Sequence, residues 1–384
     1  MKFFSLKTIL MYFYLLLISS NSVYADTSLE NLKKLCNAYG VSGFEGDVRE
    51  ILSKYWTENK IQYEIDGMGN LIGKFTTHSE TKPTLLVMAH MDEVGFITSE
   101  IDDDGFIRVV PLGGWMDHVL WSQKWVIRTP DGQYITAVSG MDAPHVLSDF
   151  TKSPIANKNM LFLDTGLSKK ELIDLGIRPG LAVIPDFKFQ KLSETRYAAK
   201  AFDDRVGLAI ILDLIRIINN DPKLLSKINV VFAATVQEEL GMRGSKVVYE
   251  SLKPNIVINI EAGIARDYPT QFTKNSIPKL GLGPAIFIYD GSMMPNQNLV
   301  HALGEISKKN TIPIQWELEL SYGQDASCLQ SAGKGMPAVN IGIPVRYAHS
   351  HIGIIDRNDY DNSIKLLKEV ILHLDRNIIN DLRL

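Results

Sequence analysis

The sequence is poor in cysteine and has no strong excess of either charge. It has 384 residues and only two cysteines, Cys36 and Cys328, which excludes a disulfide framework and a cysteine-rich zinc site. The two thiols could pair in an exported protein, but we expect two unpaired, buried thiols. Acidic and basic residues nearly balance, at 44 against 40. Charge therefore gives no reason to expect nucleic acid or an anionic membrane as a partner.

Long apolar runs are also lacking. The longest near the N-terminus covers residues 9–18, after Lys2 and Lys7, whereas a membrane-spanning helix needs about 20 apolar residues. A small residue stands at the A-x-A spacing on each side of Tyr24, so we predict a secretory signal peptide over 1–25, cut after Ala25. The mature protein is then exported, periplasmic or secreted, without stable membrane association. An uncleaved anchor is the alternative.

The chain is long enough for about two domains, and its pattern changes along its length. Near-continuous apolar strands such as 228–236 alternate with helical stretches, which indicates an α/β domain whose mainly parallel sheet has helices on both faces. Residues 99–194 instead form short strand-like pieces between Gly, Pro and Asp turns, typical of a small β-barrel or sandwich. We therefore predict one discontinuous domain, 26–98 plus 195–384, interrupted by a β insert.

Several polar residues directly follow apolar strands. In open α/β sheets, sites form beyond the carboxyl ends of the strands. The residues at these positions, with the two acids that open a long helix, are His90, Asp92, Glu238, Glu239, Glu261, His349, Asp203 and Asp204. Singly, each has a plain explanation as a solvated side chain, a core histidine or a helix N-cap. Together, two imidazoles and several carboxylates without a thiolate suit zinc, cobalt or manganese.

Charge arithmetic favours two ions over one. If the ligands are His90, Asp203, Glu239, Glu261 and His349, three carboxylates face the cations. Two divalent ions and a shared hydroxide bring the sum to zero, whereas a single ion leaves the cluster negative. Without any metal, acids buried together would need raised pKa values.

Two pairs of candidate site residues raise questions of geometry. Glu238 and Glu239 are neighbours, and neighbouring side chains on a strand point to opposite faces. We expect the strand to end at or before them, with Gly241 and Gly244 allowing the chain to turn. His90 and Asp92, two residues apart, share a face, so Asp92 can accept a hydrogen bond from the imidazole or otherwise brace the site.

Four segments carry a resemblance to a known family. "AHMDEVGF", "KAFDDRVG", "TVQEELGMRGS" and "PVRYAHSH" resemble, in order and spacing, the motifs of the M42 dinuclear metalloaminopeptidases. That family includes the TET and glutamyl aminopeptidases and proteins once called endoglucanase M. The likeness also covers "AYGVSGFEGDVR" and "LGGWMDHVLWSQKWVIRTPDG", so it spans nearly the whole mature chain.

The resemblance implies a role for each site residue. His90, Asp203 and Glu261 would hold one metal, and Asp203, Glu239 and His349 the other, with Asp203 bridging. Glu238 matches the general base and Asp92 the supporting acid. Glu238 would take a proton from the attacking water and return it to the leaving amine. The cofactors implied are two divalent ions per subunit, with zinc preferred and cobalt or manganese as alternatives.

The fold implied is a phosphorylase/hydrolase-like zinc exopeptidase domain with an inserted PDZ-like or barrel-like β domain, 99–194, that helps to assemble dimers. Substrates would be peptides that lose their N-terminal residue, and the chain would form homo-oligomers, from dimers to dodecamers. Three features depart from the family pattern. Glu261 stands where Asp is common, His351 replaces a usual proline, and an export signal is unusual. We expect His351 not to be a ligand.

Other functions remain open on sequence alone. A related dinuclear deacylase or exopeptidase could act on N-modified amino acids. A glycosidase could use paired carboxylates, although that chemistry does not need two histidines. A binding protein could keep the fold without catalysis, although every ligand position and the base position hold competent residues.

Overall fold

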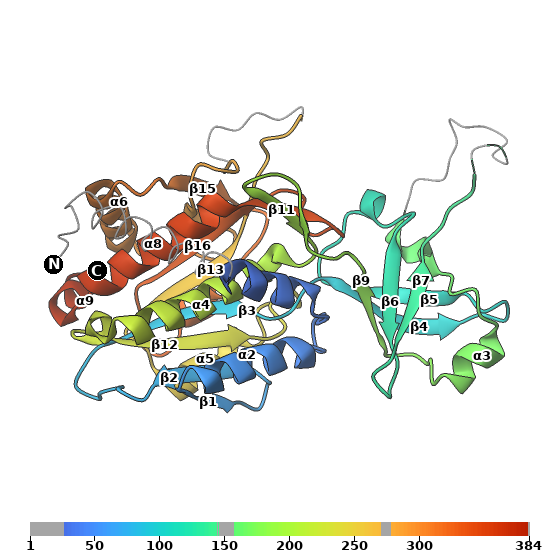
Figure 1. Ribbon diagram of the computed structural model, residues 1–384, viewed down its shortest axis with the longest axis horizontal. Coiled ribbons are helices and arrows are strands. Elements are labelled where there is room, and N and C mark those ends of the chain that lie inside the picture. Colours follow the sequence, from blue (N-terminus) through green and yellow to red (C-terminus); the bar gives the residue numbers. More distant parts are fainter. Residues whose placement is uncertain (1–26, 144, 146–156, 270–277, 383–384) are drawn as a thin grey trace, which may run out of the picture.

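The computed structural model describes residues 27–143, 145, 157–269 and 278–382. Figure 1 shows a large lobe of helices and strands joined to a smaller lobe made mainly of strands. The predicted leader, 1–25, lies outside the described residues. Within those residues, no helix combines the length and the apolar character that a bilayer crossing requires.

The large lobe is built around one mixed sheet. Among the described residues, its strand order is β1 (Ile61–Ile65), β2 (Leu71–Phe75), β12 (Asn229–Thr235), β3 (Thr84–His90), β13 (Ile256–Ile264), β16 (Ala338–Val345), β14 (Ala285–Asp290) and β15 (Gln315–Glu319). The central strands β12, β3, β13 and β16 are parallel. The edge strands β14 and β15 are also parallel, whereas β2 is antiparallel to β1 and β12, and β14 to β16, so the sheet is mixed. The β1–β2 connection is too short for the crossover that a parallel pair needs.

Helices cover both faces of this sheet, as predicted. Alternate residues of β3 point to opposite faces, so Leu85 and Val87 pack in one core while Leu86 and Met88 pack in another. The first core includes a helix over 27–37, α2 (Gly46–Glu58), α4 (Phe202–Asn220), α6 (Gln297–Asn310), α8 (Arg357–His373) and α9 (Arg376–Asp381). The second lies under α5 (Ser245–Leu252) and α7 (Ala326–Gln330).

A short sheet lies at the approach to α4. It consists of β10 (Gln190–Lys191), β11 (Arg196–Ala199) and β17 (Gly353–Asp356). Ala199 pairs with Gly353, which brings the segment before Asp203 close to the segment after His349. Two predicted ligands from distant parts of the chain are therefore brought together by backbone pairing.

The small lobe contains an antiparallel sheet that nearly closes on itself. Its order is β7 (Tyr134–Val138), β6 (Lys124–Arg128), β9 (Ala182–Pro185), β4 (Gly95–Ile101), β5 (Ile107–Leu112) and β8 (Phe162–Leu163). Val138 and Asp164, next to β8, exchange two backbone hydrogen bonds of 2.8 Å, so the edge strands approach each other. The short helices are α3 (Lys169–Asp174), η1 (Asp117–Val119), η4 (Lys158–Met160) and, in the large lobe, η5 (Pro222–Leu225). The limits 99–194 for the insert remain a prediction.

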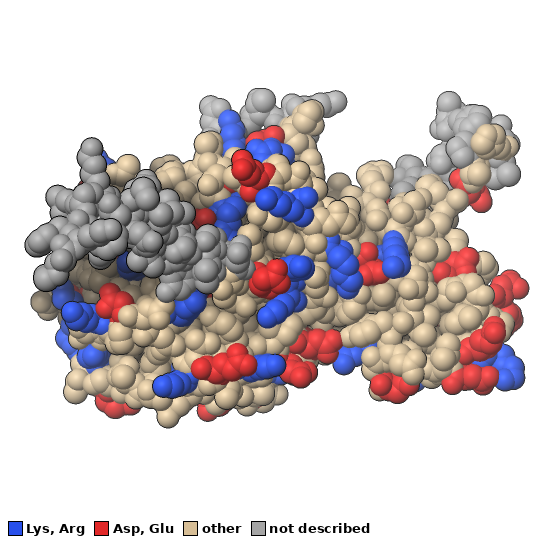
Figure 2. Space-filling model, in the orientation of Figure 1, with Lys and Arg blue, Asp and Glu red and all other residues tan. Residues whose placement is uncertain are grey.

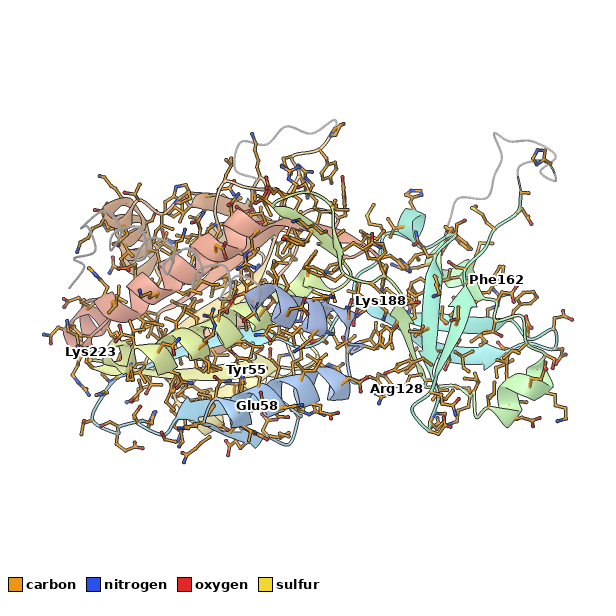
Figure 3. All side chains as sticks on the ribbon, viewed as in Figure 1. Tyr55, Glu58, Arg128, Phe162, Lys188 and Lys223 are labelled. Atoms are coloured by element: carbon orange, nitrogen blue, oxygen red, sulfur yellow. The ribbon has the colours of Figure 1, made fainter. Side chains whose placement is uncertain are left out.

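Polar side chains connect the two lobes. Arg128 of β6 lies 3.1 Å from the carboxylate of Asp47 in α2, and Tyr134 Oη donates to the same carboxylate at 2.6 Å. Lys188 Nζ donates to Tyr39 Oη at 2.7 Å, and Figure 3 shows Arg128 and Lys188 at this junction. The Arg128–Asp47 pair is partly exposed, so we expect it to contribute about 1 kcal/mol or less.

The distribution of surface charge and the state of the two cysteines match what the composition indicated. Figure 2 shows acidic and basic side chains interspersed over the visible face. Cys36 is buried and Cys328 is partly buried, and both are free thiols. The expectation of unpaired thiols is correct, although Cys328 is less buried than expected.

Candidate metal centre

The five predicted ligands meet at one edge of the central sheet. His90 ends β3 and Glu261 lies in β13, while Glu239 and His349 follow β12 and β16. Because these strands are parallel neighbours, their carboxyl ends lie at the same edge. Asp203 reaches this edge from the start of α4.

The ligand atoms form two groups that share one carboxylate. His90 Nε2 lies 3.0 Å from Asp203 Oδ1 and 3.3 Å from Glu261 Oε1. His349 Nε2 lies 3.4 Å from Asp203 Oδ2 and 3.5 Å from Glu239 Oε1. In each group the possible ligand atoms all lie within 4.8 Å of one another, a separation that suits a shared cation.

The start of α4 gives its two aspartates different tasks. Asp203 and Asp204 have non-helical backbone angles, and the regular helix follows them. Asp204 is buried and caps the helix, because its carboxylate accepts hydrogen bonds from the N–H groups of Gly207 (3.0 Å) and His90 (3.3 Å). Asp203 is thereby left to face both histidines.

Backbone carbonyls fix the tautomer of both histidines. His90 Nδ1 lies 3.0 Å from the carbonyl oxygen of Asp92, and His349 Nδ1 lies 2.8 Å from that of Gly114. A carbonyl can only accept, so each Nδ1 donates a hydrogen to it, and each Nε2 is left facing the carboxylates, where a cation would take the place of its proton. This is the arrangement that metal-binding histidines need.

The pKa values of the cluster fit a site made for cations. Burial raises the pKa of Glu239 and of Glu261 to about 7. Burial alone would lower the pKa of His90, but the carboxylates of Glu261 and Asp203 hold it well above its usual value. The Glu239 carboxylate raises the pKa of His349 to about 10. Protons here compensate for crowded negative charge, and divalent ions would replace them, so the donor set fits the predicted metals.

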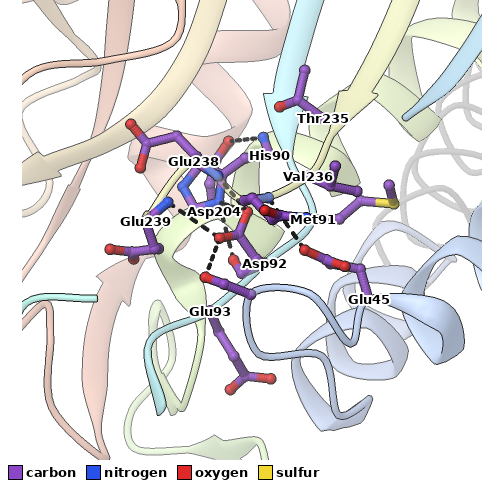
Figure 4. Close-up of polar contacts among 12 residues, drawn as sticks. Glu45, His90, Met91, Asp92, Glu93, Asp204, Thr235, Val236, Glu238 and Glu239 are labelled. Carbon is purple, nitrogen blue, oxygen red and sulfur yellow. Dashed lines mark hydrogen bonds and ion pairs between the residues drawn. The ribbon is translucent and has the colours of Figure 1, made fainter. Parts of the chain in front are cut away.

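Asp92 braces the site through the main chain of its neighbours, the second of the two expected alternatives. Its carboxylate lies 3.5 Å from His90 Nδ1, which is too long for a hydrogen bond, and the imidazole instead donates to the Asp92 main chain. The carboxylate accepts hydrogen bonds from the N–H groups of Glu238 (3.0 Å) and Glu239 (3.1 Å) and from Ser42 Oγ (2.6 Å), as Figure 4 shows in part. Asp92 therefore positions the two adjacent glutamates.

Glu238 lines a cavity of about 1050 Å³ that also contains Asp203, Glu239 and Glu261. Burial raises the pKa of Glu238 well above its usual value. Among the described residues, Glu238 belongs to neither ligand group. A carboxyl group beside the ligands but outside both groups is suited to accept and release a proton.

His351 lies apart from the ligands, as expected. Its ring is buried against Trp125, with centroids 4.1 Å apart, and near Trp115 of the small lobe. Burial lowers the pKa of His351 to about 3. It is in neither ligand group of the described residues and instead packs against the small lobe.

A buried ion cluster next to the site had no predicted role. Lys200 Nζ donates to both oxygens of Glu93, at 2.6 and 2.8 Å, and Arg205 Nη2 donates to Glu93 Oε1 at 3.1 Å. Arg205 also donates to the main-chain oxygens of Met91 and Gly40. The cluster ties the loop before α2 to the segment after β3. All three charged residues lie in the quoted motifs, but their spacing alone does not pair them.

Gln324 is a second residue that sequence reasoning missed. It is 1% exposed and lines the cavity, and neither side-chain amide atom has a hydrogen-bond partner among the described residues. Buried amide groups are normally paired. An unpaired amide in this cavity is therefore a candidate contact for substrate.

Comparison with known proteins agrees with this geometry. The sequence profile described as M42 glutamyl aminopeptidase matches residues 69–366. The lysyl aminopeptidase of Pyrococcus furiosus is 31% identical, over 90% of this chain and 97% of its own. The glutamyl aminopeptidase of Lactococcus lactis is 30% identical, over 92% of this chain and 98% of its own.

Solved structures show the same fold. A TET aminopeptidase from a marine-sediment archaeon superposes with a TM-score of 0.88 at 32% identity, covering 93% of this chain and 99% of its own. The TET1 peptidase of Pyrococcus horikoshii, described as assembling into a tetrahedron or a large octahedral shell, gives 0.80 at 29% identity, covering 90% of this chain and 100% of its own.

Proposed function

This chain belongs to the M42 family and is a metal-dependent aminopeptidase, and from that premise we propose how its site removes N-terminal residues from peptides. The observation that carries the proposal is the shared carboxylate of Asp203, which lies between two groups of ligand atoms. Two groups with a common member call for two ions. His90, Asp203 and Glu261 would hold one ion, and Asp203, Glu239 and His349 the other.

The donor types support zinc, because two imidazoles with carboxylates suit it, while cobalt and manganese accept the same ligands. When bound, divalent ions supply Lewis acidity, which lowers the pKa of a water molecule and polarises a peptide carbonyl. His90 and His349 already hold their rings with Nδ1 against a main-chain oxygen and Nε2 toward the carboxylates. Their Nδ1 hydrogens are held by main-chain oxygens, so the rings do not need to reorient.

Glu238 is the general base in this proposal. Its carboxylate takes the proton of the water as oxygen attacks the carbonyl carbon, and then passes it to the nitrogen of the leaving amine. The position of Glu238 supports that cycle, because it lines the cavity beside the ligands but belongs to neither ligand group of the described residues. Asp92 supports the reaction through the main chain of Glu238 and Glu239.

The cavity suits a substrate with a free N-terminus. Glu238 and Glu261 line it, and a free α-amino group there can bind a metal ion or meet an acidic side chain. The walls come from both lobes, with Met116 and Gln123 from the small lobe and Tyr322 from the large one. Residues beyond the scissile bond would extend between these walls.

We propose that the chain forms a homo-oligomer, because the related TET1 peptidase assembles into closed shells. Exposed apolar side chains on the edge strand β15 and just after it, Trp316, Leu318 and Leu320, support a protein contact at this side. We also propose that the mature protein is exported, from the leader-like pattern of 1–25. Sequencing the N-terminus of the mature protein tests the cut after Ala25.

A panel of aminoacyl chromogenic substrates tests the function. The enzyme is first stripped with a chelator and then restored with zinc, cobalt or manganese in separate samples. We expect activity only after metal is restored, and only on substrates with a free α-amino group. Preference for the N-acetylated form would identify a deacylase, and polysaccharide hydrolysis that survives chelation would identify a glycosidase. Full activity of metal-free protein would contradict the proposal.

A further inference from the structure

Four consecutive peptide N–H groups before and at the paired glutamates are held by side-chain oxygens. The N–H of Val236 donates to Asn70 Oδ1 at 2.9 Å, and the N–H of Gln237 donates to Glu45 Oε1 at 3.2 Å. The next two, of Glu238 and Glu239, donate to the carboxylate of Asp92. We propose that Asn70 and Glu45 are positioning residues that, with Asp92, aim Glu238 and Glu239 at their separate tasks.

The three acceptors are fixed by their own surroundings. All three are buried, and they come from the turn before β2, the start of α2 and the segment after β3. Asn70 Nδ2 donates to Asp66 Oδ2 at 2.7 Å and to the carbonyl oxygen of Gly244 at 3.0 Å, which leaves its oxygen facing Val236. Glu45 Oε1 also accepts the N–H of Gly43 at 2.7 Å. The acceptor oxygens are therefore held in place by contacts other than those they make with residues 236–239.

The held segment is not regular structure. Strand β12 ends at Thr235, and Gln237 has a φ of 54°, a left-handed value that few residues other than glycine adopt. A side chain at Gly244 would collide with Asn70 and with the main chain of Val236. Without a sheet partner, these N–H groups need other acceptors, because buried donors are rarely left unpaired. The side-chain oxygens of Asn70, Glu45 and Asp92 accept these hydrogen bonds and so stabilise this turn.

The turn separates two adjacent carboxylates. Glu239 Oε1 is brought within 3.5 Å of His349 Nε2, while Glu238 lines the cavity outside both ligand groups of the described residues. Figure 4 shows the carboxylates of the two glutamates apart from each other. A regular strand would send these side chains to opposite faces. Glu45 touches neither the proposed ligand groups nor the reacting atoms, so it acts through the main chain that it holds.

Variants of Glu45 test the proposal, which rests on the proposed role of Glu238. We expect Glu45→Ala to lower kcat by about tenfold or more with little change in KM, because small displacements of a reacting group are costly to rate. Glu45→Gln retains an acceptor oxygen and should restore most of the activity. Glu45→Asp keeps the charge but shortens the side chain, so it should also lose activity. This variant provides the test if Glu45→Ala fails to fold. Glu58→Ala, exposed at the far end of the helix that Glu45 precedes and labelled in Figure 3, is the matched control.

A double-mutant cycle separates positioning from general stability. If Glu45 acts through Glu238, Glu45→Ala should cause little further loss in a Glu238→Gln background, with metal content measured in each protein. Equal losses in both backgrounds, or Glu45→Gln as inactive as Glu45→Ala, would overturn the positioning role. Full activity of Glu238→Gln alone would instead overturn the proposed base, so the two failures are distinguishable.

Discussion

One carboxylate oxygen of Asp203 lies 3.0 Å from Nε2 of His90, and the other faces the second histidine. A residue that belongs to both ligand groups should be needed for the binding of both ions. We expect Asp203→Ala to bind almost no metal, whereas His349→Ala should keep about one ion per subunit, because the His90 and Glu261 side chains remain. Elemental analysis after dialysis measures this. Equal metal content in both variants would contradict the shared position.

Glu238→Gln should separate chemistry from metal binding. The amide keeps the size of the side chain but cannot accept the proton, so we expect kcat to fall by about 10²–10⁴-fold. Metal content should match that of the wild type, because Glu238 is in neither ligand group of the described residues. Glu250→Gln, on the exposed side of α5, is the control. Unchanged turnover in Glu238→Gln would remove this residue from the base role.

Metal affinity should weaken in acid. Burial raises the pKa of Glu239 and Glu261 to about 7, so in the metal-free protein below that pH these acids hold protons that a cation must displace. We expect the apparent Kd for zinc to rise by about tenfold or more as the pH falls from about 8 to about 6. Calorimetry in two buffers of different ionisation enthalpy should detect the released protons. A Kd that does not change with pH would contradict these pKa values.

Loss of the Gln324 amide should weaken substrate binding. A primary amide offers one acceptor and two donors, which complement the N–H and carbonyl of a peptide group. Since this amide is otherwise unpaired among the described residues, we expect Gln324→Leu to raise KM by about tenfold, the equivalent of one hydrogen bond. Gln62→Leu, exposed on β1, is the control. Unchanged steady-state constants would place Gln324 outside the substrate contact.

Removing the buried acid Glu93 should destabilise the fold. Glu93→Gln leaves Lys200 and Arg205 without a full counter-charge, and an unpaired buried charge costs about 3–5 kcal/mol. We expect the Tm of the metal-loaded protein to fall by about 5 °C or more. Asp103→Asn breaks an exposed pair with Lys169 and should leave Tm nearly unchanged. A similar Tm for both variants would contradict the importance of the buried cluster.

The position of the site could be predicted because it follows from sheet topology. Apolar strands such as β3 and β13 indicate parallel neighbours, and the carboxyl ends of parallel strands meet at one edge. Residues at or just after the ends of such strands, among them His90 after β3's apolar run and Glu239 after β12, could therefore be selected before any contact was known. Strand β12 also ends before Glu238, as we expected because neighbouring side chains on a strand point to opposite faces.

The remaining features depend on main-chain contacts that residue types do not reveal. The carbonyl oxygen that holds His349 belongs to Gly114, and any residue carries such an oxygen. The turn at Gln237 needs an unusual φ from a residue with no preference for it. Similarly, the antiparallel pairing of β14 with β16 follows from the path of the chain, which apolar content does not specify.

The contact between His349 and Gly114 has a consequence for attempts to shorten this protein. Gly114 follows β5 of the small lobe, yet its carbonyl orients the ring of a histidine that follows β16 of the large lobe. A minimal enzyme that replaces the small lobe with a linker would retain all five ligand side chains. Its second histidine would nevertheless be free to rotate and to exchange tautomers. Truncation should thus yield a protein that folds around one well-ordered ion and one poorly held ion.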